Sequence, residues 1–328
     1  MGPERAPPLL VVGCHPVAMT RRDRHSGFMA SMSGFFYRHP RSKLLLLLLP
    51  ALLWLVVLYL GSIAGLLVNS FWSIEEFTGL IDRTLTLNTY KALLEPANRD
   101  IVLRTLAMAA AVTIACAFLA FPLAYYMARF ATRRGRFVLY LAVLMPLWSS
   151  YLVRALAWRQ ILAREGVLYW ALGKVGLDGL LDAVILAPMV GGESLIASNI
   201  SLFVVYTYLW LPFMILPVEA ALERVPATFL EASSDLGAKP RFTFRRVVLP
   251  LAKPGLVAGS IFTFSLTLGD FILPSMFGRS GFFLGQQVNT QIGVVGNTPL
   301  AAAFTFVALA IMTVYLAIAK RAGAFQSL

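Results

Sequence analysis

Long stretches without a charged residue alternate with short basic segments along most of this chain. A bilayer core of about 30 Å is crossed by roughly 20 apolar helical residues, and a helix satisfies all of its backbone groups within one segment. Uncharged or nearly uncharged stretches of about this size occur at residues 44–68, 105–128, 137–153, 194–218, 255–278 and 300–319. The pattern predicts an all-α, polytopic membrane protein with about six transmembrane helices.

Composition supports a single membrane domain. The 328 residues are 59% hydrophobic and only 13% charged, whereas soluble domains carry about 25% charged residues. Too little polar sequence remains to coat a second globular unit. We therefore expect a polar tail at residues 1–43 and one transmembrane domain at residues 44–328.

The positions of the basic residues predict the orientation. Cytoplasmic loops keep an excess of Lys and Arg, and most of the 28 basic residues fall in the tail, in the loops 129–136 and 222–254, and at the C-terminus. The sequence thus predicts that both termini are cytoplasmic. The net charge of +12 is explained by this topology and does not indicate a nucleic-acid partner.

The segment 154–193 is predicted to lie outside, as amphipathic or re-entrant structure. Its apolar part, residues 183–190, is too short to cross a bilayer. Trp158, Leu162 and the stretch 165–172 show apolar residues at helical spacing, which favours at least one interfacial helix.

Catalytic chemistry is not indicated by the sequence. Cys14 and Cys116 lack the spacing of a metal site or a disulfide framework, and the three histidines all lie in the tail. A lipid anchor at Cys14 is rejected because no apolar signal segment precedes it. The chain has no phosphate-binding Gly-x-x-x-x-Gly-Lys-Ser/Thr loop. We expect no catalytic site, no metal and no cofactor, which disfavours a membrane-embedded enzyme. An ion-coupled secondary transporter would show inverted repeats and several buried ionisable groups, and neither is visible in the sequence.

The loop 222–254 is the most informative segment. Its sequence predicts two short helices around a break at Gly237, the second beginning at Pro240. Arg and Phe also combine in amphipathic helices that lie on anionic lipid, so the composition of the loop leaves that reading open. The order and spacing of the residues in this loop favour a more specific interpretation than a helix lying on lipid.

The spacing of Glu231-Ala232-Ser233, Gly237, Val247 and Leu249-Pro250 resembles the signature of permease subunits of binding-protein-dependent ABC importers. Ser233 replaces an alanine of that signature and Val247 an isoleucine. The resemblance implies the type I permease fold of these importers, in the bacterial cytoplasmic (inner) membrane, with this loop as the coupling helix that docks into an ATPase subunit. It also implies the partners: an ATP-binding subunit dimer, a second permease subunit, homologous or identical, and a periplasmic or extracytoplasmic substrate-binding protein, besides membrane lipid.

Two further stretches, 150–158 and 268–274, resemble the polyamine branch of these permeases, which carries spermidine and putrescine. Permeases for opines, amino-acid derivatives or aminophosphonates share much of this pattern and remain the alternative. The resemblance implies alternating access, in which ATP-driven closure of the ATPase pair moves the coupling helices and the spans reorient.

Asp270 is the candidate substrate residue, because an acid within a span is costly and usually faces a pathway or a partner. The alternative is that it pairs with a basic side chain or caps a helix break beside Gly269 and Pro274. Aromatic side chains could offer cation-binding faces along the same route, although such residues also form interfacial belts; these are Trp148, Tyr151, Trp158, Tyr206, Tyr208 and Trp210. Arg154 is expected to mark the outer boundary or to pair with an acid.

Overall fold

The structure is a computed structural model that describes residues 40–75, 78–176, 179, 194–278 and 281–322. The chain divides into two units, Met1–Ala64 and Gly65–Leu328. Most of the predicted tail, residues 1–39, lies outside the described residues.

The described part of the first unit is helical. Helix α2 (Pro40–Trp54) passes through a π-helical segment, η1 (Leu55–Leu60), into α3 (Gly61–Ser70) without a break. Residues Leu47–Ser70 are long and apolar enough to cross a membrane. Hydrophobic side chains occupy every side of this helix, as expected where lipid is the solvent. The predicted first span is confirmed.

The described residues of the second unit are mainly helical and include one small antiparallel hairpin, β1 (Ser73–Ile74) with β2 (Ile81–Asp82), in which Ser73 pairs with Asp82. Its helices follow in this order: α4 (Asn88–Leu93), α5 (Pro96–Arg129), α6 (Arg133–Trp148), α7 (Tyr151–Leu162), α8 (Val167–Val175), α10 (Asn199–Glu223), α11 (Ala227–Asp235), α12 (Pro240–Thr243), η2 (Phe244–Val248), α13 (Leu249–Gly269), α14 (Ile272–Met276), α15 (Leu284–Thr290), η3 (Gln291–Val295) and α16 (Thr298–Arg321).

Four helices of the second unit can each span a membrane: Pro96–Arg129, Asn199–Glu223, Pro240–Gly269 and Thr298–Arg321. Together with Leu47–Ser70 they confirm five of the six predicted spans. The remaining candidate is a pair of helices, Arg133–Trp148 and Tyr151–Val175, bent by 97°. The described residues thus contain five helices that can span a membrane, or six spans if the bent pair counts as one.

The prediction of an unbroken helix through residues 137–153 is wrong. Helix α6 ends at Trp148, Ser149 is extended, and α7 begins at Tyr151. Pro146 lies in the last turn of α6, and the hydroxyl of Ser149 donates to the Pro146 carbonyl at 2.8 Å. This side-chain bond satisfies a carbonyl at the helix end and stabilises the bend.

The prediction that span five extends to residue 278 is also wrong. Helix α13 ends at Gly269, and Asp270 has an extended backbone with ψ of 135°. The Asp270 carboxylate accepts from the backbone N–H groups of Ile272, at 3.3 Å, and Leu273, at 3.1 Å. These bonds cap the start of α14, so the chain restarts in a new direction.

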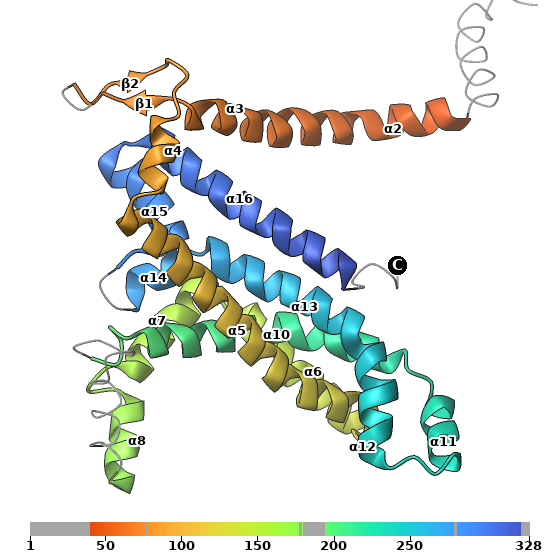
Figure 1. The fold of residues 1–328 in the computed structure, drawn as a ribbon. Coiled ribbons are helices and arrows are strands. Elements are labelled where there is room, and N and C mark those ends of the chain that lie inside the picture. Colours follow the sequence, from red (N-terminus) through yellow and green to blue (C-terminus); the bar gives the residue numbers. More distant parts are fainter. Residues whose placement is uncertain (1–39, 76–77, 177–178, 180–193, 279–280, 323–328) are drawn as a thin grey trace, which may run out of the picture. The chain divides into compact units, whose positions relative to one another are not determined.

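Helices α5, α10 and α13 form the packed centre of the second unit (Figure 1). Small buried residues on α5, including Ala109, Cys116, Ala120 and Ala124, recur along one face. On α13, Gly255 and Gly259 are buried against α10. Lipid tails are as apolar as the helix surfaces, so burying apolar side chains between helices gives little driving force. Small residues let the helices approach closely, and the resulting van der Waals contacts stabilise their packing.

Gly255→Ala is expected to destabilise this helix pair. A Cβ atom at Gly255 would lie 2.5 Å from the Pro217 carbonyl oxygen and 2.6 Å from the Ala221 Cβ atom, so the helices must separate. Overpacking of this kind costs about 1–3 kcal/mol. Thermal unfolding of the purified chain in detergent measures the loss. Gly269→Ala on the same helix is the control, since its added Cβ atom meets no described atom within 4 Å; equal stability of the two variants would contradict the prediction.

The predicted helical structure within the segment 154–193 is present as α7 and α8. They are joined at Gly166, where a Cβ atom would lie 2.3 Å from the Gln160 carbonyl oxygen. The apolar stretch 183–190 lies outside the described residues.

Candidate functional site

The segment between α10 and α13 has the predicted form of two helices around a glycine. Helix α11 is followed by Gly237 in the left-handed region, at φ +74°, and α12 continues through η2 into α13 as one long helix, Pro240–Gly269. The hydroxyls of Ser233 and Thr243 lie 2.8 Å apart and join the two arms. Ser233, one of the two departures from the signature spacing described above, therefore has its own hydrogen-bond partner here.

The remaining signature residues are largely open to the surroundings. Glu231, Ala232, Leu249 and Pro250 are exposed, and Val247 is half-buried. A Cβ atom added at Gly237 would meet no atom of the described chain within 4 Å. A hollow of about 420 Å³ adjoins the glycine, and its lining includes Leu236, which is 87% exposed. The hollow beside Gly237 is thus open, with an apolar side chain exposed at its edge.

In the second unit, α11 and α12 lie at one end of the α5, α10 and α13 bundle, and α14 and α15 lie at the other (Figure 1). The two predicted sites are thus separated by the length of the bundle. The segment 222–254 and Asp270 are connected through α13, which begins in the first and ends beside the second.

An ionic cluster lies where the segment 222–254 leaves the bundle. Glu219 on α10 is 2% exposed and is paired with Arg136 on α6 at 2.5 Å; the Tyr140 hydroxyl donates to the same carboxylate. Arg136 also forms an ion pair with Glu223. The guanidinium of Arg129, at the end of α5, donates to the Val225 carbonyl at 2.7 Å. Three helices are tied together where the segment leaves the bundle.

At the opposite end, the Asp270 carboxylate lies among aromatic side chains. It accepts from the hydroxyls of Tyr151, at 2.8 Å, and Tyr206, at 3.0 Å. The Tyr151 ring is stacked on Trp210, with centroids 5.7 Å apart and planes within 8°, and Tyr206 lies beside the same indole at 6.4 Å. Asp270 forms no ion pair with a Lys or Arg of the described residues.

The candidate aromatic residues separate into three groups. Tyr151, Tyr206 and Trp210 belong to the Asp270 cluster. Trp158 and Tyr208 contact each other edge to face at 5.2 Å, and the described contacts do not join them to Asp270. Trp148 is 78% exposed and belongs to neither group. Arg154 is half-buried and shows no ion pair with an acid in the described part of the chain.

Reasoning from the sequence missed the ionic cluster. A count of Lys and Arg predicts the orientation of a membrane protein but does not reveal acidic partners such as Glu219. The available signal was its position, directly after the uncharged stretch 194–218 and next to a basic loop, since an acid at that depth needs a cationic partner.

The fold defines a multi-pass membrane protein with at least five helices that can span a bilayer. Residues 120–322 match the family model for the binding-protein-dependent transport system inner membrane component, and the chain belongs to this family. It is 53% identical over 300 residues, covering 92% of this chain and 96% of the relative, to the inner membrane ABC transporter permease protein YdcU of Escherichia coli K12. It is 26% identical to the spermidine/putrescine transport system permease protein PotB of the same organism, covering 82% of this chain and 94% of PotB.

Solved structures agree on the fold. A chain of a bacterial ABC transporter involved in the import of the acidic polysaccharide alginate superposes with a TM-score of 0.67 at 15% identity, covering 89% of this chain and 99% of the other. The chain is therefore the permease subunit of an ABC importer of the bacterial inner membrane.

Proposed function

We propose that this permease imports a small organic cation of the polyamine class, such as spermidine or putrescine. The observation that carries the proposal is Asp270, a carboxylate at a helix break at one end of the bundle. It lacks a cationic partner among the described residues. The similarity to PotB, which is named for spermidine and putrescine, supports the same substrate class.

The electrostatics of the break favour a cation. The Asp270 carboxylate is held in one position by two tyrosine hydroxyls and two backbone N–H groups, so its negative charge is fixed in place. It lies between the C-terminal end of α13, whose dipole adds negative potential, and the N–H groups that begin α14, which hold the carboxylate in place. Broken helices whose ends point at a charged substrate are a general device of membrane transport sites.

The aromatic side chains suit the apolar and cationic parts of a polyamine. The faces of Tyr and Trp attract ammonium groups, an effect of about 0.5–2 kcal/mol each depending on desolvation. Trp210 is 7% exposed and stacked with both Tyr151 and Tyr206, so it positions these tyrosines. Tyr151, which is half-buried, is the ring that remains partly accessible beside the carboxylate. A carboxylate with adjacent aromatic faces discriminates against anionic solutes.

The segment 222–254 couples this site to ATP hydrolysis on a separate subunit pair. Docking of α11 into the ATPase would cover Leu236 and the open side of Gly237, which the chain itself leaves exposed. The ionic cluster of Arg136, Glu219 and Glu223 then transmits movement of α11 to α6 and α10 together. With a second permease subunit completing the pathway, a binding protein delivers the solute from the outer side.

Asp270→Asn tests the substrate assignment. The variant keeps a similar shape but loses the charge, and a hydrogen bond to a charged group contributes about 1.5–3 kcal/mol. We expect kcat/KM for radiolabelled spermidine uptake, in vesicles carrying the full importer, to fall by about 10- to 100-fold. Glu95→Gln, which removes an exposed acid outside the spans, is the control and is expected to behave as wild type.

Binding-protein-stimulated ATP hydrolysis separates a substrate role from a structural one. Loss of spermidine uptake with hydrolysis retained supports a substrate role for Asp270. Unchanged uptake in Asp270→Asn would contradict it, and stimulation by an opine or an aminophosphonate without polyamine uptake would replace the polyamine class.

A further inference from the structure

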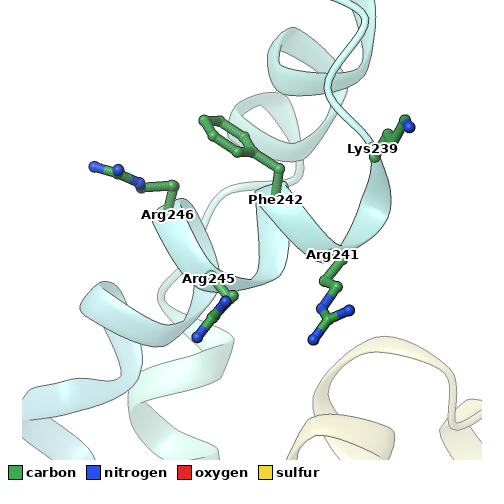
Figure 2. A pocket seen from close by; sticks show the side chains of 5 residues that line it. All are labelled: Lys239, Arg241, Phe242, Arg245 and Arg246. Atoms are coloured by element: carbon green, nitrogen blue, oxygen red, sulfur yellow. The ribbon is translucent and has the colours of Figure 1, made fainter.

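The two ends of the long helix Pro240–Gly269 have different surroundings. Its first turns carry exposed side chains around an open hollow of about 560 Å³. Figure 2 shows the residues that line this hollow, which are Lys239, Arg241, Phe242, Arg245 and Arg246. At the other end, Gly269 and the following Asp270 are packed backbone against backbone on α15. The position of Asp270 therefore depends on a helix that contributes none of the hydrogen bonds described for its carboxylate.

Gly285, in the first turn of α15, is the point of contact. A Cβ atom at Gly285 would lie 2.6 Å from the Asp270 carbonyl oxygen, 2.7 Å from the Gly269 carbonyl oxygen and 2.8 Å from the Asp270 carbonyl carbon. All three are backbone atoms, which cannot rotate away as the end of a long side chain can. Because Cβ atoms are essentially never found within 3.0 Å of such neighbours, a side chain at this position requires the two backbones to separate by several tenths of an ångström. Glycine permits the close approach.

The first turn of α15 is fixed by contacts with other helices. Phe283 and Leu284 are 3% and 2% exposed. Phe283 belongs to the same apolar cluster as Leu273 of α14, and Leu284 belongs to a second cluster with Phe304 of α16. The backbone N–H of Leu284 donates to the buried Thr105 hydroxyl of α5 at 2.9 Å. Helix α15 therefore cannot move away from Asp270 without losing these contacts.

The break after α13 is the less constrained side of the contact. Gly269 and Phe271, the two neighbours of Asp270 in the sequence, are exposed, so burial within the described chain holds neither of them. A Cβ atom at Gly285 would thus displace the Gly269–Asp270 peptide rather than α15. The Asp270 carboxylate is covalently joined to this peptide through its Cα atom, and its hydrogen bonds to the two tyrosine hydroxyls would lengthen.

We propose that Gly285 is a positioning residue for substrate binding, an inference that rests on the proposed role of Asp270 as the substrate carboxylate. The missing side chain lets α15 lie directly against the Gly269–Asp270 peptide, and this contact sets where the carboxylate lies. Groups that bind a ligand must be held within about 0.5 Å of their productive position. A displacement of several tenths of an ångström is then enough to weaken the binding of an ammonium group.

Gly285→Ala is expected to lower kcat/KM for radiolabelled spermidine uptake about tenfold, in vesicles carrying the full importer, since a misplacement of about 1 Å can cost about 100-fold. Gly293→Ala in η3 is the matched control, because its added Cβ atom meets no described atom within 4 Å, and it is expected to behave as wild type.

A double-mutant cycle separates positioning from a general packing defect. If Gly285 acts through the Asp270 carboxylate, Gly285→Ala should change kcat/KM by less than about twofold in a chain that already carries Asp270→Asn. A tenfold loss in both backgrounds would show that Gly285 serves packing alone and would overturn the proposal.

Thr105→Val tests the same arrangement without adding volume beside the break. It removes the acceptor of the Leu284 N–H, so the first turn of α15 loosens, and KM for spermidine is expected to rise while binding-protein-stimulated ATP hydrolysis is retained. Thr105→Ser keeps the hydroxyl and is expected to restore KM. Wild-type kinetics in both Gly285→Ala and Thr105→Val would overturn the proposal.

A cryo-EM structure of the Gly285→Ala importer decides which backbone moves, whatever the solute is. The expected result is α15 in place and the Asp270 carboxylate displaced from the Tyr151 hydroxyl. A displaced α15 with the Asp270–Tyr151 bond intact would overturn the proposal. Absence of spermidine uptake by the wild type would contradict the polyamine class, and the structure would still decide the role of Gly285.

Discussion

Replacing Gly237 by leucine is expected to reduce solute uptake to background while the chain still inserts into the membrane. Gly237 has a φ of +74°, a conformation that costs a residue with a Cβ atom about 1–2 kcal/mol. This strain is small compared with the loss expected for transport. The added side chain meets no described atom of the chain itself within 4 Å, so its main effect falls on the partner that the open surface receives.

A matched control separates local strain from lost docking. Gly79 also has a positive φ, +68°, and an added Cβ atom there likewise meets no described atom within 4 Å, but it lies beside β2, outside the coupling segment. Gly79→Leu is expected to retain most uptake. Gly237→Asn, which tolerates the left-handed conformation, is expected to remain defective because it still projects a side chain toward the ATPase. Normal uptake by Gly237→Leu in vesicles would contradict the coupling assignment.

Arg136→Ala is expected to cause the largest loss of stability. Glu219 is 2% exposed, and removal of Arg136 leaves its carboxylate with the Tyr140 hydroxyl as its remaining described hydrogen-bond partner. Removing one member of a buried ion pair costs about 3–5 kcal/mol because the other charge stays buried. Thermal unfolding of the purified permease in detergent measures the loss of stability.

Two comparisons identify the cause. Arg134→Ala removes an exposed arginine from the same basic segment and is expected to change stability by no more than about 0.5 kcal/mol. The double replacement Arg136→Leu with Glu219→Leu removes both charges and is expected to be less destabilising than Arg136→Ala alone. Similar melting of Arg136→Ala and wild type would show that the cluster does not hold the helices together.

Hydropathy and signature spacing predicted much of this molecule. The apolar stretches predicted five of the helices that can span a membrane because lipid imposes one simple requirement of length and polarity. The spacing around Gly237 predicted two helices and a break because the glycine and Pro240 act locally. Such features depend on neighbours in the sequence and are readable from it.

The errors arose where a side chain satisfies the backbone at a helix end. The sequence 137–153 is uncharged throughout, yet Ser149 and Pro146 allow the chain to bend by 97° after α6. The sequence leaves two roles open for Asp270, binding substrate or capping a helix break. Its bonds to the backbone of Ile272 and Leu273 show that it caps a break. Hydropathy averages over such positions.

Contacts between distant segments were the least predictable part of the candidate site. Asp270 meets Tyr151 and Tyr206 from two other helices, 119 and 64 residues away in the sequence. Aromatic residues near a span end are expected in an interfacial belt in any membrane protein, so their type alone did not distinguish Tyr151 from the exposed Trp148. The packing of α7 and α10 around the break makes that distinction.

ATP-driven accumulation of radiolabelled spermidine by vesicles containing the wild-type chain, its ATPase subunits, the second permease and the binding protein tests the central claim most directly. The account predicts accumulation against a gradient that requires both ATP and the binding protein and that excess putrescine reduces. ATP hydrolysis stimulated by the loaded binding protein without any entry of spermidine or putrescine would contradict it.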